Sequence, residues 1–283
     1  MRAVVITGAS TGIGRACALT LDRRGFHVFA GVRKDEDGQA LRGAASDRLV
    51  PVHMDVTDGE SILGARDLVA ERVGAAGLAG LVNNAGTTLP CPVEYLPLEQ
   101  FRRQLEVNLT GHLAVIQALL PLLRSGRGRI VNVSSVGGKV AGPLMAPYVA
   151  AKYGMEGLSD TLRLELGWSG MHVAVIEPGL ISTAMGGKLQ RDTEATLRGL
   201  PEDGRLRYRR PLEAMAATIS KEAANGSPPE VVARAVAHAL TSRKPRTRYP
   251  VGVGARRLLL LRRVLPDRWM DRVFLRTLGV KPG

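Results

Sequence analysis

Seven short apolar runs, separated by segments of helical character, constrain the fold more than any other feature of the sequence. The runs lie at 2–7, 27–32, 49–54, 78–82, 129–134, 173–177 and 248–251. Short, continuously apolar runs are typical of parallel strands that are buried on both faces. A helix between two such strands returns the chain to the same end of the sheet, so that the next strand runs parallel. The sequence therefore predicts an α/β fold with a doubly wound parallel sheet in a single domain.

The turn after the first run is rich in glycine and leads into a helix predicted over 15–24. It consists of Thr7-Gly8-Ala9-Ser10-Thr11-Gly12-Ile13-Gly14. In such a turn glycine lets the backbone approach a pyrophosphate, and the helix N-terminus presents free N–H groups and a positive dipole. The turn therefore predicts a Rossmann-type dinucleotide site. Its predicted cofactor contacts are Gly8, Ser10, Thr11, Gly12, Ile13 and Gly14.

Residues after the second and third runs indicate which dinucleotide binds. Arg33 follows the second run, where an acid would hold the adenosine ribose of NAD(H). Arginine at this position favours a 2′-phosphate and hence NADP(H) over NAD(H), with a solvated turn residue as the alternative. Asp55, followed by Val56, is expected to accept a hydrogen bond from the adenine amino group. The alternative is that Asp55 or Thr57 caps a helix that begins near Gly59.

The carboxyl ends of the fourth and sixth runs add further candidate contacts, because parallel strands deliver these ends to one crevice. Asn83-Asn84-Ala85-Gly86 follows the fourth run, and Pro178-Gly179 ends the sixth run sharply. The Ile181 N–H and the Thr183 hydroxyl are expected to reach a cofactor amide or phosphate. The predicted cofactor contacts at the strand ends are Asp55, Val56, Asn83, Ala85, Gly86, Pro178, Gly179, Ile181 and Thr183.

Tyr148 and Lys152 form the candidate catalytic pair. They are four residues apart on a helix predicted over 147–166 and therefore share one face. A lysine ammonium beside a phenol favours the phenolate and makes the phenol a usable proton donor and acceptor. Ser135 lies before them across a loop that can fold back and hold a substrate oxygen beside the phenol. A buried tyrosine and a solvated lysine on an ordinary helix are the alternative interpretation.

Asn108 lies midway along a helix predicted over 98–123, where asparagine is unfavourable because its amide competes for backbone hydrogen bonds. Two interpretations are open at this point. Asn108 is either a satisfied core amide or a site residue that kinks the helix and holds a water.

Residues 184–227 interrupt the regular alternation of strands and helices. They contain helical stretches around 188–198 and 211–223, before a helix predicted over 229–240. An excursion at this place is where a substrate lid is expected. The pocket beneath it is predicted to be apolar, because no fixed charge lies in 140–148 and an unpaired buried charge is costly. The predicted lining residues are Val140, Leu144, Met145 and Met185.

Basic charge is concentrated at the C-terminal end. Of the net charge of +13, the twelve basic and two acidic residues of 243–283 supply +10. The tail 252–283 is predicted to form two helices separated at Pro266, and one face of the second carries Trp269, Met270, Val273, Phe274 and Thr277. This face packs on its own domain or on a second subunit of a homo-oligomer, or it contacts an anionic membrane surface. Nucleic acid is not expected, because no recognition motif accompanies the charge.

Cysteine content and hydropathy exclude several classes of protein. Cys17 and Cys91 are the two cysteines, and they lie in no disulfide or metal-ligand spacing. The five histidines are scattered, so no metal site is expected. No run of eighteen apolar residues predicts a membrane-spanning helix, and no signal peptide precedes the first run. The expected location is cytoplasmic, with peripheral membrane contact through the tail as an alternative.

Taken in order, these motifs resemble those of the short-chain dehydrogenase/reductase family over about residues 2–251. They are Thr7-Gly8-x-x-x-Gly12-x-Gly14, Asp55-Val56, Asn83-Asn84-Ala85-Gly86, Asn108, Ser135, Tyr148-x-x-x-Lys152 and Pro178-Gly179. The stretches 80–86 and 128–135 look closest to the retinol/hydroxysteroid dehydrogenase-like branch. Members of that branch often bear hydrophobic C-terminal extensions, as this chain does, but their N-terminal membrane anchor is not seen in this sequence. The resemblance implies a dinucleotide-binding domain over 1–251 and a basic helical extension over 252–283.

The resemblance also implies a hydride transfer between NADP(H) and a carbonyl or alcohol carbon of a lipophilic small molecule. Tyr148 then donates or accepts the proton on the oxygen, and Lys152 lowers the tyrosine pKa and holds the nicotinamide ribose. Ser135 positions the substrate oxygen, and Asn108 holds a water that links Lys152 to solvent. Three alternatives remain: an NAD-dependent alcohol or hydroxysteroid dehydrogenase, a non-catalytic dinucleotide sensor, and an adaptor that acts through its tail. The intact set of Ser135, Tyr148 and Lys152 argues against the sensor, which needs no tuned phenol.

Overall fold

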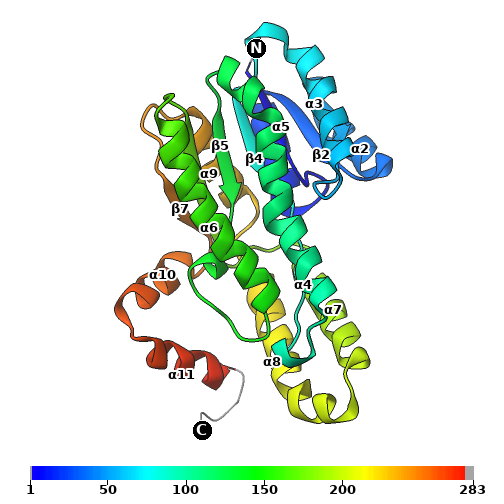
Figure 1. Cartoon of the computed structure of the whole chain (residues 1–283), viewed down its shortest axis with the longest axis vertical. Helices are drawn as coiled ribbons and strands as arrows, with labels where there is room; N and C mark the ends of the chain where they lie inside the picture. Colours follow the sequence, from blue (N-terminus) through cyan, green and yellow to red (C-terminus); the bar gives the residue numbers. More distant parts are fainter. Residues whose placement is uncertain (1, 278–283) are drawn as a thin grey trace.

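The computed structural model describes residues 2–277 and contains a seven-stranded sheet (Figure 1). Its strands are β1 (Ala3–Ile6), β2 (His27–Val32), β3 (Leu49–His53), β4 (Gly80–Asn83), β5 (Arg129–Val133), β6 (His172–Pro178) and β7 (Arg248–Val251). Their order is β3-β2-β1-β4-β5-β6-β7, and every neighbouring pair is parallel. All seven predicted runs form strands, so the doubly wound parallel sheet is confirmed.

The direction of winding changes beside β1. Ala3 of β1 pairs with His27 of β2 on one side, and Val4 of β1 pairs with Gly80 of β4 on the other. Connections on the two sides of β1 therefore lead away from each other, and ligands of such sheets bind outside the carboxyl ends of the strands at this point. The glycine-rich turn after β1 and the Asn83–Gly86 turn after β4 both leave the sheet there.

Helices cover both faces of the sheet (Figure 1). One face carries α1 (Gly12–Arg23), α2 (Asp35–Arg42) and α9 (Glu230–Thr241). The opposite face carries α3 (Gly59–Val73), α5 (Gly111–Ser125) and α6 (Ala146–Gly167). Each face buries its own apolar core. Successive strand residues alternate between the two cores, so that Val4 and Ile6 pack with α1 and α9 whereas Ala3 and Val5 pack with α3 and α5.

The helix predicted over 98–123 is interrupted at Asn108. It consists of α4 (Leu98–Leu105), a π-helical turn over Glu106–Thr110 and then α5. A π turn breaks the regular i→i−4 hydrogen-bond pattern, and such turns are frequent at functional sites. The whole segment Leu98–Ser125 is long and apolar enough to cross a membrane, with a mean hydropathy of 1.3 in its most apolar window. Part of it forms the core between α3 and α6, where Leu119 and Leu123 are fully buried.

Residues 184–227 form a helical hairpin of α7 (Met185–Gly199) and α8 (Glu202–Ala224), which we call the lid (Figure 1). The predicted start of the second helix at 211 is wrong, because α8 continues through Pro211. Proline normally ends or kinks a helix. Here α8 begins after Pro201 with Glu202 and Asp203 in its first turn, where negative charge stabilises the positive end of a helix.

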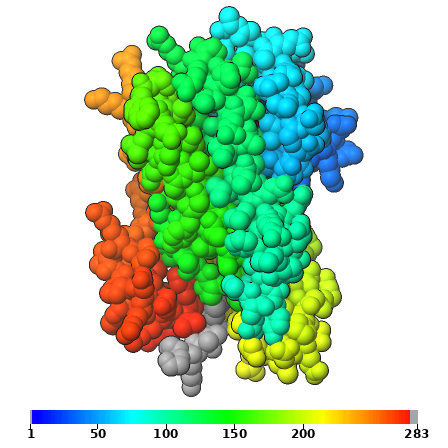
Figure 2. Space-filling model, viewed as in Figure 1, coloured from blue at the N-terminus to red at the C-terminus, as the bar shows by residue number. Residues whose placement is uncertain are grey.

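The C-terminal tail forms α10 (Ala255–Val264) and α11 (Asp267–Thr277), separated at Pro266 as predicted. The segment α11 contacts α8, and the tail and the lid both lie at the lower end of the molecule (Figures 1 and 2). Of the predicted apolar face, Met270 is buried and Phe274 is partly buried, whereas Trp269 and Val273 are exposed. Packing on the chain's own domain therefore covers only part of this face.

Candidate active site

The glycine-rich turn packs against the turn that follows β4. Gly8 has φ of +63°, a left-handed conformation that costs residues with a Cβ about 1–2 kcal/mol. A Cβ on Gly8 would lie 2.7 Å from the Cα of Ala85. A Cβ on Gly14 would collide with the carbonyl oxygen of Gly8 and with the side-chain amide of Asn84. Glycine is therefore required at position 8 by conformation and packing, and at position 14 by packing alone.

Asn84 and Thr7 fix the two turns to each other. The Thr7 hydroxyl oxygen accepts hydrogen bonds from the N–H groups of Asn84 and Ala85, at 2.9 and 3.0 Å. The Asn84 side-chain amide donates to the carbonyls of Thr7 and Gly8, both at 3.0 Å. The predicted contacts Gly8 and Ala85 are thus held together by a side chain, Asn84, that the predicted contacts omit.

Asn83 has a different role from its neighbour. Its amide nitrogen donates to Asn132 Oδ1 at 3.0 Å, and the Asn132 amide donates to the Ser159 hydroxyl at 2.9 Å. All three side chains are buried between the sheet and α6. Because Asn83 is the last residue of β4, its side chain follows the strand alternation into the core. The structure therefore places the Asn83 side chain in a core network and not beside the glycine-rich turn.

The N-terminus of α1 is open to an anion. Thr11 is the N-cap residue, but its hydroxyl makes no capping hydrogen bond, and the first turn carries no acidic residue. Ser10, Thr11 and Ile13 are partly or fully exposed along the turn. The first N–H groups of a helix have no intrahelical acceptor and attract negative charge. Together with the close glycine packing, this end of α1 fits the pyrophosphate of a dinucleotide.

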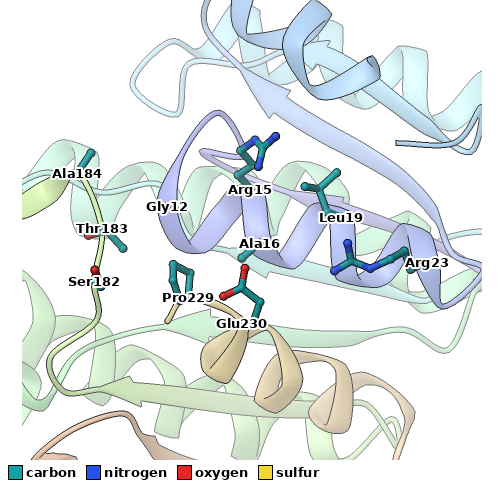
Figure 3. Close-up of a pocket in the computed structure, with 10 residues that line it drawn as sticks. All are labelled: Gly12, Arg15, Ala16, Leu19, Arg23, Ser182, Thr183, Ala184, Pro229 and Glu230. Atoms are coloured by element: carbon teal, nitrogen blue, oxygen red, sulfur yellow. The ribbon is translucent and has the colours of Figure 1, made fainter. Parts of the chain in front are cut away.

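The segment after β6 closes the other side of the glycine-rich turn. The Gly179 N–H, directly after Pro178, donates to the Val251 carbonyl at 2.8 Å. Thr183 lies against Gly12, because a Cβ on Gly12 would be 3.3 Å from Thr183 Cγ2. A cavity of about 290 Å³ lies between this segment, α1 and the start of α9, and Gly12, Arg15, Thr183 and Glu230 are among its lining residues (Figure 3). The structure thus brings the predicted contacts Gly12 and Thr183 together, whereas the Ile181 side chain is buried.

Arg33 and Asp55 lie near each other after β2 and β3. Arg33 is exposed. Burial raises the pKa of Asp55, but hydrogen bonds from Thr57 and the charges of Arg33 and Arg103 outweigh it and hold this pKa below its usual value. The Asp55 carboxylate accepts hydrogen bonds from the Thr57 N–H at 2.9 Å and the Thr57 hydroxyl at 2.8 Å. Asp55 is therefore an ionised acceptor within reach of the Arg33 charge.

The cap of α3 is a neighbouring acid. The Asp58 carboxylate accepts a hydrogen bond from the Glu60 N–H at 3.0 Å, and Asp58 is the N-cap residue. The interpretation of Asp55 or Thr57 as the cap is wrong, because a capping side chain must come from the residue directly before the first helical turn.

Ser135, Tyr148 and Lys152 converge at the start of α6. The Lys152 amine donates to the Val133 carbonyl at 2.8 Å and lies 5.8 Å from the centre of the Tyr148 ring. The short helical turn η4 (Val136–Gly138) follows Ser135. A Cβ on Gly137 would be 3.2 Å from Tyr148 Cε1 and 3.3 Å from Ser135 Oγ, so this turn lies against both side chains. Three members of the predicted catalytic set, Ser135, Tyr148 and Lys152, therefore lie in one place.

Burial dominates the electrostatics of the pair. Burial raises the pKa of Tyr148, and a hydrogen bond with Ser135 partly offsets it. Lys152 is only 4% exposed. Burial lowers its pKa from 10.5 to about 8, while the negative charge of Glu156 acts in the opposite direction. The phenol is therefore held in its protonated form near neutral pH, beside an amine whose charge is sensitive to its surroundings.

Asn108 lies next to the turn that follows β4, and its side chain is fully buried. Its Oδ1 accepts from the Thr87 N–H at 2.9 Å, and its Nδ2 donates to the Thr87 carbonyl at 2.8 Å. A Cβ on Gly86 would be 3.2 Å from Asn108 Oδ1. Asn108 is therefore a satisfied buried amide that also lies in the π turn interrupting the helix, and its role as a site residue that holds a water stays a prediction.

His112 is a buried polar residue near this site that the sequence patterns do not indicate. Its Nε2 lies 2.6 Å from the Ala85 carbonyl, whereas Nδ1 has no hydrogen-bond partner among residues 2–277. Burial and the positive charge of Lys152 lower the His112 pKa to about 3, and the Ala85 hydrogen bond only partly offsets this. The ring is therefore neutral, with Nε2–H as the donor. A single histidine in an apolar helix carries no motif that could have revealed it.

A third apolar cluster lies between the lid and the loop before α6. Leu200, Leu212 and Met215 of the lid are buried at its centre, and Leu144 and Met145 pack against them. These two predicted pocket residues therefore lie against the lid. In the part of the chain that the structure describes, the other two lie outside this cluster: Val140 is buried after η4, and Met185 is exposed at the start of α7.

Two exposed contacts connect the lid to the turn η2 (Val93–Tyr95). The Tyr95 hydroxyl donates to the Asp203 carboxylate at 2.6 Å, and the Arg207 guanidinium donates to the Glu94 carboxylate at 2.6 Å. The hydrogen bond to Asp203, and to a lesser extent burial, raise the pKa of Tyr95 to about 12. We call these four residues the latch. It joins α8 to the loop that follows β4.

Comparison with known proteins identifies the family to which this arrangement belongs. The model of the family described as short chain dehydrogenase matches residues 2–194. This chain is a member of the short-chain dehydrogenase family. Human retinol dehydrogenase 16 is 40% identical to it over 281 residues, which cover 95% of this chain and 86% of the relative. Human 17-beta-hydroxysteroid dehydrogenase type 6 is 38% identical to it over 279 residues, which cover 97% of this chain and 88% of the relative.

A solved structure agrees with this assignment. A short-chain dehydrogenase from Burkholderia cenocepacia J2315, crystallised in complex with NADP, has a TM-score of 0.72 and 26% identity and covers 100% of both chains. The resemblance to the retinol and hydroxysteroid dehydrogenase branch is confirmed by the two human relatives. The chain is therefore an NAD(P)-dependent oxidoreductase that acts on CH–OH groups.

Proposed function

We propose that this short-chain dehydrogenase transfers a hydride between NADP(H) and a carbonyl or alcohol carbon of an uncharged lipophilic molecule. The observation that carries the proposal is the convergence of Ser135, Tyr148 and Lys152, with the apolar residues Leu144 and Met145 in the loop between Ser135 and Tyr148. The relatives named for retinol and for hydroxysteroids support a lipophilic alcohol as the substrate class.

The proton chemistry is assigned to Tyr148. When bound, the nicotinamide supplies or accepts the hydride. The Tyr148 phenol, whose pKa burial raises, donates its proton to the carbonyl oxygen in reduction and recovers it in oxidation. The Lys152 ammonium stabilises the resulting phenolate through its positive charge, 5.8 Å from the ring centre. The Ser135 hydroxyl, beside the phenol, donates a hydrogen bond to the same substrate oxygen.

A preference for NADP(H) is supported by the residues after β2. Arg33 is exposed and follows the strand directly, so its guanidinium is free to pair with a 2′-phosphate in two parallel hydrogen bonds. Asp55, whose pKa the Arg33 charge helps to lower, already accepts hydrogen bonds from Thr57. A solved relative with NADP is consistent with this preference.

Replacing Tyr148 by Phe tests the proposed function. The ring still packs but the proton donor is lost, so the rate of substrate turnover is expected to fall by about 10²–10⁴. The dissociation constant of NADPH, measured by its fluorescence, should change little. Tyr153→Phe is the matched control, because Tyr153 lies on the same helix with an exposed side chain. Near-normal turnover by Tyr148→Phe would contradict the assignment.

We also propose that α10 and α11 contact an anionic membrane surface. Leu260 and Val264 are 63% and 69% exposed, and Trp269 and Val273 are 56% and 47% exposed. Basic side chains alternate with them along both helices: Arg256, Arg257, Arg262, Arg263, Arg268, Arg272 and Arg276. Exposed apolar side chains with basic neighbours are typical of helices that lie in a membrane interface. Each basic residue near an anionic surface adds about 1 kcal/mol to binding.

Co-sedimentation with vesicles tests this contact. The wild-type chain should bind vesicles that contain phosphatidylglycerol, bind phosphatidylcholine vesicles weakly, and dissociate as salt is raised. Trp269→Ala should reduce binding, whereas Leu63→Ser, at an exposed leucine of α3, should not. Equal binding of Trp269→Ala and the wild type would contradict the contact. Self-association that depends on concentration, without vesicle binding, would assign the tail to a homo-oligomer instead.

A further inference from the structure

A buried cluster of charges lies behind Lys152, where α6 packs against β6 and β7. Glu156 follows Lys152 by one helical turn and is 3% exposed. Its Oε2 accepts from the Arg248 guanidinium at 2.9 Å and lies 3.2 Å from the Lys139 amine. Its Oε1 has no hydrogen-bond partner among the described residues 2–277. Glu156 is therefore a buried carboxylate with two cations on one oxygen and none on the other.

Arg248 connects Glu156 to the strands. Its guanidinium also pairs with Asp160 at 2.9 Å and with Glu177 at 3.3 Å. Arg248 belongs to β7, Glu177 to β6, and Glu156 and Asp160 to α6. A buried charge pair is tolerated when good geometry and further hydrogen bonds compensate for its desolvation. The four side chains therefore fix the position of the Glu156 carboxylate from both the helix and the sheet.

The loop after β5 links this carboxylate to Lys152. A Cβ on Gly138 would lie 2.9 Å from Glu156 Cγ, 2.9 Å from the Lys152 carbonyl oxygen and 2.7 Å from Ser134 Oγ. Ser134 Oγ is also buried without a partner in the described chain. The Val133 carbonyl accepts a hydrogen bond from the Lys152 amine. The loop from Val133 to Gly138 therefore lies directly against the two turns of α6 that carry Lys152 and Glu156.

The charge of the Lys152 amine needs a nearby carboxylate. Among residues 2–277, its one hydrogen bond is to the neutral Val133 carbonyl, and burial favours the uncharged amine. Around it, α6 contributes Tyr148 and Glu156, α5 contributes the neutral His112, β6 contributes Glu177, and Lys139 and Arg248 lie beyond the carboxylates. Of these groups, Glu156 is the one whose charge raises the Lys152 pKa.

We propose that Glu156 is a positioning residue for the reaction, whose carboxylate, fixed by Arg248 and Lys139, keeps the Lys152 amine protonated. Lys152 stabilises the phenolate of Tyr148 only while it is charged, so Glu156 acts on the substrate through two residues and touches neither substrate nor cofactor. The inference rests on the role of Lys152 in the proposed function. The experiment below reads the amine itself, so its outcome is separate from the success or failure of that function.

Glu156→Gln removes the charge and keeps the shape of the side chain. The chain contains seven lysines, so labelling lysine with carbon-13 at Cε gives few NMR signals, and Lys152→Arg identifies the one from Lys152. We expect the titration midpoint of the Lys152 signal to fall by about one pH unit or more in Glu156→Gln. Glu156→Asp, which keeps the charge, should restore most of the shift. Glu165→Gln, at an exposed acid of the same helix, should leave the midpoint unchanged.

Kinetics provide a second readout that a purely structural role would not produce. With a midpoint lowered by about one unit, the loss in kcat/KM for carbonyl reduction should be roughly fivefold larger at pH 8 than at pH 6. A structural defect would reduce the rate equally at both pH values. If Glu156→Gln unfolds when free, the NMR titration is repeated with saturating NADPH, which stabilises the folded chain. An unchanged Lys152 midpoint in Glu156→Gln, or a loss of rate independent of pH, would overturn the proposal.

Discussion

The crevice at the carboxyl ends of the strands and the lid at the lower end of the molecule are held together in different ways. In the crevice, Gly8, Gly14 and Ala85 are in direct backbone contact, and the Thr7 hydroxyl is shared by two backbone N–H groups. At the lid, the polar connection to η2 consists of two side-chain contacts: the hydrogen bond of the half-buried Tyr95 to Asp203, and the exposed ion pair of Glu94 with Arg207. Backbone packing resists change, whereas exposed ion pairs contribute little and are screened by salt. The comparison predicts that the turns of the crevice are rigid and that the connection between α8 and η2 adjusts more easily.

The largest effect on stability is expected at Gly14, in the tightly packed turn of the crevice. A methyl group in Gly14→Ala collides with the Gly8 carbonyl and the Asn84 amide, so the cost should be at the upper end of overpacking, about 3 kcal/mol or more. Urea unfolding should show this loss, and NADPH binding should weaken with it. Gly64→Ala in α3, where no atom lies within 4 Å of the added Cβ, is the control and should be neutral or stabilising. Equal stabilities of the two variants would refute the tight packing of the turn.

Glu177, near the carboxyl end of β6, tests how burial of a carboxyl group changes the pH dependence of stability. Burial, and next the charge of Glu156, raise its pKa from 4.5 to about 7 against the charges of Arg248 and Lys139. The folded state therefore binds this proton more tightly than the unfolded state, so the stabilisation is present below pH 4.5 and is lost as pH rises through 7. The free energy of unfolding of the wild type, relative to Glu177→Gln, should fall by roughly 2–3 kcal/mol between pH 4.5 and 8. Parallel pH profiles of the two chains in urea unfolding would show that Glu177 does not titrate in this range.

Arg33→Ala tests whether the exposed Arg33 gives NADP(H) its preference over NAD(H). Only NADP(H) carries the 2′-phosphate that the guanidinium pairs with, so its affinity should fall about tenfold or more, while NAD(H) affinity changes little. Fluorescence titration with NADPH and NADH measures both values on one protein sample. Lys34→Ala, at the next exposed residue, is the control. Equal losses for the two cofactors would remove the support for an NADP(H) preference.

The smallest effect is expected at the latch. Arg207→Ala breaks its ion pair with Glu94, both side chains being exposed, so KM for a bulky substrate should change only about two- to threefold. The NADPH dissociation constant should stay the same, because the latch does not touch the crevice. Arg209→Ala is a matched control, since Arg209 pairs with Glu213 inside α8 and does not connect the lid to η2. A change in NADPH affinity equal to the change in KM would show that the two regions are not separable.

The sequence predicted that the glycine-rich turn, Tyr148 and Lys152 lie at the carboxyl ends of the strands because these signals are local. The spacing of Tyr148 and Lys152 places them on one helical face, and the glycine positions follow from a turn of eight residues. Asn83 and Asn84 show the limit of such reasoning. Which of the two side chains enters the core depends on where β4 ends, and a shift of one residue exchanges their roles.

Interactions between distant segments could not be predicted. Arg248 lies 92 residues after Glu156 and 71 after Glu177, and no motif links the three residues. The second helical stretch of the lid was predicted around 211–223, but the acidic first turn after Pro201 and the packing of α7 on α8 carry the helix through Pro211. Leu144 and Met145 pack against the lid, whereas Met185, the first residue of α7 in the lid, lies exposed outside their cluster, because the orientation of α7 depends on tertiary packing.

The most direct test of a lipophilic substrate compares two carbonyl compounds with NADPH as reductant. The measured quantity is the ratio of kcat/KM for decanal to kcat/KM for pyruvate. Each buried methylene of the aldehyde contributes about 0.8 kcal/mol, and no fixed charge in 140–148 is available to pair with a carboxylate. We therefore expect decanal to be favoured by at least about tenfold in the wild type. A higher kcat/KM for pyruvate would contradict a lipophilic substrate and leave the roles of Tyr148 and Lys152 intact.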